Sequence, residues 1–273
     1  LPKRSESKSS EADAQTCPFV QSEPFYLKTT FRKMLEPMEK QGTRMLTPFI
    51  DMSAGVEAAG TSLVDTALKM GADRKTASLA FAMAAERQRE CFAEMRRIGE
   101  SALEALAADP DKVGVIVFGR PYNGFVEEAH MGIPHKLASR GVCVIPLDSL
   151  PIAPFESKDH MYWGMGQLIL KAARYVAAHP QLFGTYITNF SCGPDSFLIS
   201  YFRDIMGRKP SLTLELDSHT ADAGIETRIE AFLDIVAQYR QLIGKNTISA
   251  ATASHFRPAR TFVENGQSMV AAS

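Results

Sequence analysis

The sequence predicts an α/β protein whose second half is a doubly wound, flavodoxin-like or Rossmann-like parallel sheet, preceded by a partly helical N-terminal region. Between residues 112 and 243, short apolar runs alternate with segments of helical periodicity. This order implies strands that pair in parallel through right-handed crossovers. The run over 113–118 is apolar throughout, which is typical of a strand buried on both faces.

The first half of the chain divides into two predicted parts. Residues 1–15 are polar and rich in Ser, Glu and Lys, a composition that predicts a disordered arm. Residues 16–111 form the predicted mixed, partly helical region, with Gly71 separating its two helices and Asp73 capping the second. The elements expected there are a strand over 44–52, a helix over 53–70 and a longer helix over 75–108.

Residues 112–243 form the predicted Rossmann-like domain, and residues 244–273 an extended tail or linker. The strands expected in the domain cover 113–118, 142–147, 183–190 and 211–216. The helices expected there cover 127–140, 162–179, 195–207 and 223–243.

Composition excludes several classes of protein. The chain has 273 residues, a formal net charge of −1 and 22% charged residues, so no strong field would attract nucleic acid or an anionic membrane. No apolar stretch is long enough to span a bilayer. The four cysteines lie far apart without a framework spacing, which favours a reducing cytoplasm over a disulfide-bonded secreted protein.

The predicted chemistry gathers at one edge of the sheet. Ligands of open parallel sheets bind outside the carboxyl ends of the strands, and polar loops follow all four predicted strands, whereas the helix-to-strand returns are short and plain. Cys192 lies in the turn after the third strand, at the start of a helix, where free amide groups and the helix dipole favour a thiolate. A thiolate binds metal clusters or attacks electrophiles; the alternative is a small buried residue in a turn.

For the other polar residues at this edge, the sequence allows both a ligand-binding role and a structural role. Arg120 suits a phosphate or carboxylate ligand, or forms a salt bridge to Asp148 or Asp195. Tyr122 and Asn123 either donate to a ligand or complete a turn. Asp195 is expected to cap its helix and to tune the neighbouring cysteine. His219 is an acid/base candidate or a hydrogen-bonded loop residue, whereas Cys91 and Cys143 are expected to be packing residues.

Several motifs of known mechanism are absent from the sequence. It contains no Walker P-loop, no Gly-x-Gly-x-x-Gly after a strand, no Cys-x-x-Cys or His-x-x-x-His zinc pair and no Gly-x-Ser-x-Gly elbow. We therefore do not expect this chain to hydrolyse ATP unaided.

The loop sequences resemble a known family over most of residues 16–243. The matching segments are TCPFVQ (16–21), FGRPYN (118–123), GVCVIPLDSLP (141–151), YWGMGQ (162–167), TNFSCGPDSF (188–197) and LELDSHTADAGIETR (214–228). They are similar to the large acyl-CoA dehydratase activase-related proteins, which in turn are similar to the 2-hydroxyacyl-CoA dehydratase and benzoyl-CoA reductase subunits.

This resemblance implies Rossmann-like layers and a [4Fe-4S] or related iron–sulfur cluster held by cysteine thiolates. An ATP-dependent activator would pass one electron at low potential to the cluster and on to an acyl-CoA substrate, and an enzyme of this type would be a lyase or reductase. By motif match, Cys17 and Cys192 are the candidate ligands, with Arg120, Tyr122 and Asn123 beside them. Since a cubane needs about four ligands, the resemblance implies a fragment completed by another subunit or by further domains of a longer polypeptide.

Two other functions stay open on the sequence. The first is a non-catalytic α/β interaction domain that docks the ATP-dependent activator or a partner subunit. The second is a hydrolase or transferase with Cys192 as nucleophile, for which His219 is the evident base.

Overall fold

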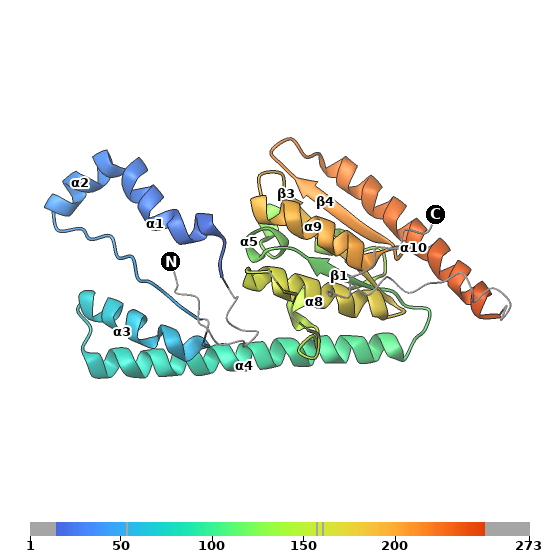
Figure 1. The fold of residues 1–273 in the computed structure, drawn as a ribbon, viewed down its shortest axis with the longest axis horizontal. Coiled ribbons are helices and arrows are strands. Elements are labelled where there is room, and N and C mark those ends of the chain that lie inside the picture. The colour runs from blue at the N-terminus through green and yellow to red at the C-terminus, as the bar shows by residue number, and fades with distance from the viewer. Residues whose placement is uncertain (1–14, 53, 157, 160, 249–273) are drawn as a thin grey trace, which may run out of the picture.

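The computed structural model describes residues 15–52, 54–156, 158–159 and 161–248, and it has an α/β architecture (Figure 1). Its strands are β1 (Gly114–Phe118), β2 (Cys143–Pro146), β3 (Leu182–Asn189) and β4 (Ser211–Leu216). Its longer helices are α1 (Pro18–Thr30), α2 (Arg32–Lys40), α3 (Gly60–Lys69), α4 (Arg74–Ala107), α8 (Gly164–Ala178), α9 (Gly193–Met206) and α10 (Asp222–Ile248). Its shorter helical segments are η1 (Val56–Ala59), α5 (Pro121–Gly124), α6 (Glu127–His130), α7 (Ile133–Ala138) and η2 (Leu147–Ser149).

The four strands form one all-parallel sheet in the order β2-β1-β3-β4, which confirms the doubly wound fold class. Ile116 in β1 is opposite Ile145 in β2 on one side and Gly184 in β3 on the other. The chain moves outward from β1 to β2, then returns past β1 to form β3 and β4. This reversal makes the gap between the carboxyl ends of β1 and β3 the topological switch point, where open α/β sheets bind ligands.

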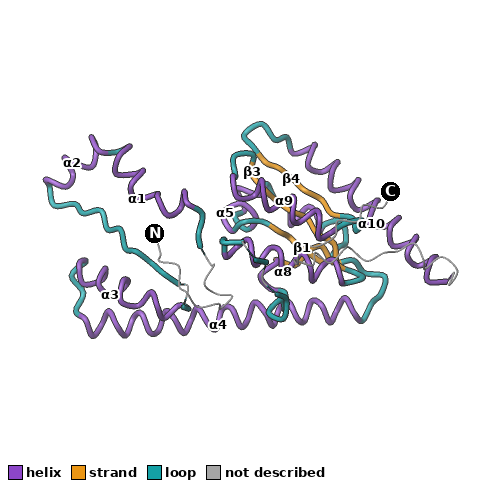
Figure 2. The backbone as a smooth tube through the Cα atoms, viewed as in Figure 1, coloured by secondary structure: helices purple, strands orange, loops and turns teal. Residues whose placement is uncertain are grey.

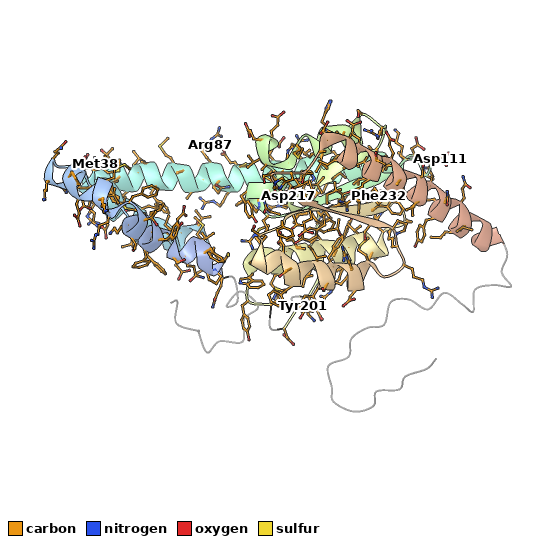
Figure 3. The ribbon with its side chains drawn as sticks, turned by 90° about the horizontal axis from the view of Figure 1, so that it is seen from above. Met38, Arg87, Asp111, Tyr201, Asp217 and Phe232 are labelled. Carbon is orange, nitrogen blue, oxygen red and sulfur yellow. The ribbon has the colours of Figure 1, made fainter. Side chains whose placement is uncertain are left out.

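Helices cover both faces of the sheet, and the alternation of side chains along β1 supplies both cores. Ile116 and Phe118 belong to the core under α8 and α9, whereas Val115 and Val117 belong to the core under α7 and α10. Figure 3 shows this layering from above, with Tyr201 of α9 and Phe232 of α10 on opposite sides of the sheet. A strand buried on both faces has little room for polar side chains, so the polar chemistry is left to the loops.

Helix α4 joins the sheet layer to the N-terminal region. Asp73 caps it by accepting a hydrogen bond from the Thr76 N–H at 3.0 Å, as the sequence predicts. With 34 residues it is about 51 Å long, and in Figure 1 it runs from beneath α3 to beneath the sheet layer. Its last turns pack on the sheet layer through the buried Leu106, while its first turns pack against α3.

Residues 18–52, which we call the N-terminal arm, contain α1, α2 and an extended segment, and none of them is buried. Figure 2 shows both helices standing away from the sheet. The predicted strand over 44–52 is wrong, because these residues pair with no strand among those that the structure describes. Without a partner to satisfy its backbone groups, an apolar run gains nothing from strand geometry. Residues 18–30 and 32–40, for which no helix was predicted, form α1 and α2.

The remaining predicted elements are present, with one interruption. The helix expected over 127–140 is split into α6 and α7, because Met131 and Gly132 adopt left-handed conformations with φ of 52° and 68°. Helix α10 continues past residue 243 to Ile248, into the predicted tail. The rest of that tail, and the predicted disordered arm apart from Gln15, lie outside the described residues. Within the described part of the chain, no helix is long and apolar enough to cross a membrane.

We predict that Gly99→Ala destabilises the protein, because a Cβ at Gly99 would lie 2.0 Å from the backbone oxygen of Ser149, where α4 meets η2. Forcing these elements apart should cost about 1–3 kcal/mol of unfolding free energy, measured by urea denaturation. Gly224→Ala in α10 is the matched control, since a Cβ there meets no atom within 4 Å, and alanine should stabilise that helix by up to about 1 kcal/mol. Equal midpoints for the two variants would contradict the close packing of α4 on η2.

Candidate functional site

The carboxyl edge of the sheet carries a cavity of about 660 Å³, within the range of roughly 300–1,000 Å³ typical of small-molecule sites. It lies against the loops that follow β1, β3 and β4, and against α6. Figure 3 shows Asp217, after β4, at the end of the sheet that faces the arm, and Asp111, before β1, at the opposite end. The main contributors are Tyr122, Asn123, Glu128, Phe190, Asp217 and His219.

Cys192 stands beside this cavity, at the N-cap of α9. The Tyr122 hydroxyl and the Asp195 backbone N–H both donate hydrogen bonds to its sulfur, and the Arg120 guanidinium acts on the same sulfur electrostatically. Arg120 also lies over the Tyr122 ring, with its Cζ 5.7 Å from the ring centroid. The loops after β1 and β3 are therefore joined at the switch point through the Cys192 side chain.

Cys192 does not favour the thiolate form that its position at a helix N-terminus predicts. Burial raises the pKa of the Cys192 thiol, and the hydrogen bonds from Tyr122 and from the Asp195 N–H offset this only in part. Burial and the neighbouring sulfur likewise raise the pKa of the Tyr122 hydroxyl, so it stays protonated and remains a donor. The half-buried Cys192 is therefore a neutral thiol near pH 7 as long as no metal ion binds its sulfur.

Asp195 does not cap α9, in contrast to the prediction, because Cys192 occupies the cap position. Its carboxylate is only 1% exposed and accepts hydrogen bonds from the Tyr186 hydroxyl at 3.1 Å and from Thr188 Oγ1 at 2.8 Å. Both donors lie on β3. Asp195 thus fixes the first turn of α9 to β3, and with it the position of the Cys192 sulfur.

Arg120 is nine-tenths buried, yet among the described residues no carboxylate lies within 4 Å of its guanidinium. The predicted alternative, a salt bridge to Asp148 or Asp195, is not formed. Asp148 is itself partly buried, one of its oxygens lacks a partner, and burial raises the pKa of its carboxyl group. The positive charge of Arg120 therefore remains available to the sulfur or to a ligand.

Asn123 lies in α5, directly after β1, and is 2% exposed. Its Nδ2 is buried and has no hydrogen-bond partner. The turn that carries it is tight: a Cβ at Gly119 would lie 2.9 Å from the Ile187 oxygen and 3.1 Å from the Gly124 Cα. The Asn123 backbone N–H completes a turn by donating to the Arg120 oxygen at 2.9 Å, whereas its side-chain Nδ2 takes no part in that turn.

His219 lies on the far wall of the cavity, and its side chain is 90% exposed. Its backbone N–H donates to Asp217 Oδ1 at 2.8 Å, and its ring lies 3.3 Å from the Ser218 hydroxyl. The Thr220 hydroxyl donates to the same Asp217 oxygen. These contacts shape the loop after β4, and none of them brings the His219 ring to Cys192.

Cys17 is a buried N-cap residue of α1, followed by Pro18 at the first helical position. The segment before it is tied to the sheet layer, because the Gln15 N–H donates to Tyr162 O at 2.8 Å and Gln15 O accepts from the Gly164 N–H at 3.1 Å. The Trp163 ring between them lies 6.3 Å from the Phe197 ring in α9. Gln15, predicted to be in a disordered arm, thus brings the Cys17 segment to the N-terminal ends of α8 and α9.

The other two cysteines lie elsewhere. Cys91 is exposed on α4, so the prediction that it packs is wrong, and Cys143 is half-buried at the first residue of β2, at the opposite edge of the sheet. In the part of the chain that the structure describes, no three His, Cys, Asp or Glu side chains form a group able to hold a metal ion.

Sequence reasoning missed two kinds of residue at this site. Tyr186 and Thr188 were assigned to a strand core, although their hydroxyl groups position Asp195; hydroxyl-bearing residues near the end of an apolar strand were the available signal. Glu128 was assigned to a continuous helix, and it reaches the cavity wall because that helix breaks at Met131.

We predict that iodoacetamide labels Cys192 slowly near neutral pH in metal-free protein, because its pKa is raised and little thiolate is present. Labelling followed by peptide mass spectrometry should speed up as pH rises past the ordinary thiol pKa of about 8.5. Tyr122→Phe removes a hydrogen bond to the thiolate, and it should move the inflection to still higher pH. The exposed Cys91 serves as the internal control. Fast labelling of Cys192 at neutral pH would contradict a raised pKa of its thiol.

Comparison with known proteins adds one match. A family model described as the CoA enzyme activase uncharacterised domain matches residues 1–150. That range contains Cys17 and the loop from Arg120 to Asn123, and it ends before Cys192. No curated protein and no solved structure matches the chain.

Proposed function

Because this chain belongs to the CoA enzyme activase uncharacterised domain family, we propose that it serves in its acyl-CoA activase system as an iron–sulfur module of the 2-hydroxyacyl-CoA dehydratase type. In this proposal the module takes part in low-potential electron transfer to an acyl-CoA substrate. Its partners are an ATP-dependent activator and further domains or subunits of the same system.

The observation that carries the proposal is the environment of the Cys192 sulfur. The sulfur lies at the topological switch point, receives hydrogen bonds from the Tyr122 hydroxyl and the Asp195 N–H, and is accompanied by an Arg120 without an acidic partner. Burial alone makes a thiolate costly there. A bound metal ion supplies the missing positive charge and deprotonates a coordinating thiol, so the site suits a metal-bound thiolate better than a free one.

The ligand set is incomplete within this chain. Cys17 and Cys192 both occupy helix N-caps, and the Gln15–Trp163 pairing brings the Cys17 segment to the same edge of the sheet. A [4Fe-4S] cubane takes about four ligands, so the remaining ligands would come from another part of the activase system. When bound, such a cluster accepts and donates single electrons at low potential.

The residues of this chain would tune that potential. Hydrogen bonds to a ligating sulfur and nearby positive charge stabilise the more negative, reduced state. Tyr122 supplies the hydrogen bond and Arg120 the charge. The Asp195 carboxylate opposes them, but its hydrogen bonds to Tyr186 and Thr188 disperse part of its charge.

A second candidate function, a non-catalytic domain that docks the activator or a partner subunit, has its own supporting observation. The N-terminal arm, residues 18–52, buries none of its side chains against the rest of the chain. Its large exposed apolar residues include Phe19, Phe25, Tyr26, Met34 and Phe49. A surface of this kind is typical of protein–protein contacts, and it is compatible with the iron–sulfur function.

We predict that anaerobically purified protein, reconstituted with iron and sulfide, is brown and binds iron through Cys17 and Cys192. Cys17→Ser and Cys192→Ser should each lose most of the bound iron and the charge-transfer absorbance, because serine replaces a thiolate ligand. Cys91→Ser and Cys143→Ser are the matched controls and should keep both, since these residues lie away from the switch point.

The iron assay also separates the two candidate functions. A colourless, iron-free protein after reconstitution would contradict the iron–sulfur function and favour the docking function. Loss of iron in the Cys91 or Cys143 variant would show that the ligand pair is wrongly chosen.

A further inference from the structure

The Asn123 side chain is a polar group that the fold buries without using. It is 2% exposed, it lines the cavity, and its Nδ2 has no partner. An unsatisfied buried amide N–H costs about 1–3 kcal/mol, a cost that a carbonyl oxygen of a ligand would remove. A secondary amide offers such an oxygen.

The charge of the cavity excludes one half of coenzyme A. Its wall carries the carboxylates of Glu128 and Asp217, and no Lys or Arg is among the described residues that line it. Hydrogen bonds from the His219 N–H and from Thr220 hold the pKa of Asp217 below its usual range, so this carboxyl is ionised at neutral pH. The phosphates of the nucleotide half would meet like charge here, whereas a neutral chain would not.

The remaining wall is apolar and suits a chain of methylene groups. Met131, Phe190 and Leu216 contribute it, beside the polar groups of the loops. A neutral ligand with amides separated by hydrocarbon therefore matches the alternation of polar and apolar surface in this cavity. The pantetheine arm of a CoA thioester has this composition.

Tyr122 marks the end of the cavity that lies nearest the Cys192 sulfur. It lines the cavity and donates its hydroxyl hydrogen bond to the Cys192 sulfur. A thioester placed at the Tyr122 end would lie beside that sulfur, and the nucleotide half would lie outside the cavity, in solvent.

We propose that the cavity at the carboxyl edge of the sheet binds the neutral pantetheine arm of an acyl-CoA, with Asn123 paired to one of its amides. The inference rests on the proposed function for the substrate class, and it assigns the recognition to the amide-bearing arm rather than to the phosphates.

The test uses the metal-free full chain and two halves of coenzyme A as probes, pantetheine and adenosine 3′,5′-bisphosphate. We expect pantetheine to compete with coenzyme A for binding, measured by ligand-observed NMR, and the bisphosphate not to compete. Asn123→Leu should weaken pantetheine binding roughly tenfold, since a buried amide pair is lost. It should not lower the melting temperature, because Nδ2 of Asn123 makes no hydrogen bond among the described residues. Asn123→Ala repeats the test if the leucine variant fails to fold.

Competition by the bisphosphate without competition by pantetheine would overturn the inference, as would unchanged pantetheine binding in both Asn123 variants. Because these probes are used without metal, their result is independent of the iron assay. A chain that binds iron but not pantetheine would refute this inference alone, and a chain that binds pantetheine but no iron would refute the cluster alone.

Discussion

The reversal of winding direction after β2 is the constraint on which the rest of the site depends. It sets β1 and β3 side by side, so the loop after one strand faces the loop after the other at a single edge. Tyr122 reaches the Cys192 sulfur only because these two loops are neighbours. Strands β1 and β3 are buried on both faces and cannot hold polar groups without cost, so the fold concentrates its functional side chains at this edge.

Burial gives the site its electrostatic character. The position of Cys192 at a helix N-terminus favours a thiolate, yet the pKa of the thiol is raised because desolvation outweighs the hydrogen bonds and the charge around it. Arg120, which is buried more deeply than Cys192, has no acidic side chain within 4 Å among the described residues. A bound metal ion would stabilise the Cys192 thiolate, and the resulting anionic centre would lie beside the Arg120 charge. This is the physical basis for the function proposed above.

Much of the fold follows from the sequence, because apolar runs and helical periodicity report directly on burial. The parallel sheet and the cap at Asp73 are examples. The strand over 44–52 was wrong because pairing depends on a partner, which no local pattern reveals. Asp195 was assigned as a cap because its position in the sequence is right for one, whereas its hydrogen bonds come from a strand packed beneath the helix. The unpaired Nδ2 of Asn123 could not be predicted from the sequence, because the partners of a buried amide depend on how the loops pack together.

The iron–sulfur proposal requires that Cys17, immediately before the N-terminal arm, and Cys192, at the switch point, lie close together at one edge of the sheet. The most direct measurement is intramolecular bridging by a reagent short enough to join only adjacent thiols, in folded protein carrying Cys91→Ser and Cys143→Ser. The account predicts one bridged product that contains both the Cys17 and the Cys192 peptides, and its loss when the protein is unfolded before treatment. If both thiols react with the reagent singly in the folded protein and no bridged peptide forms, the shared site does not exist.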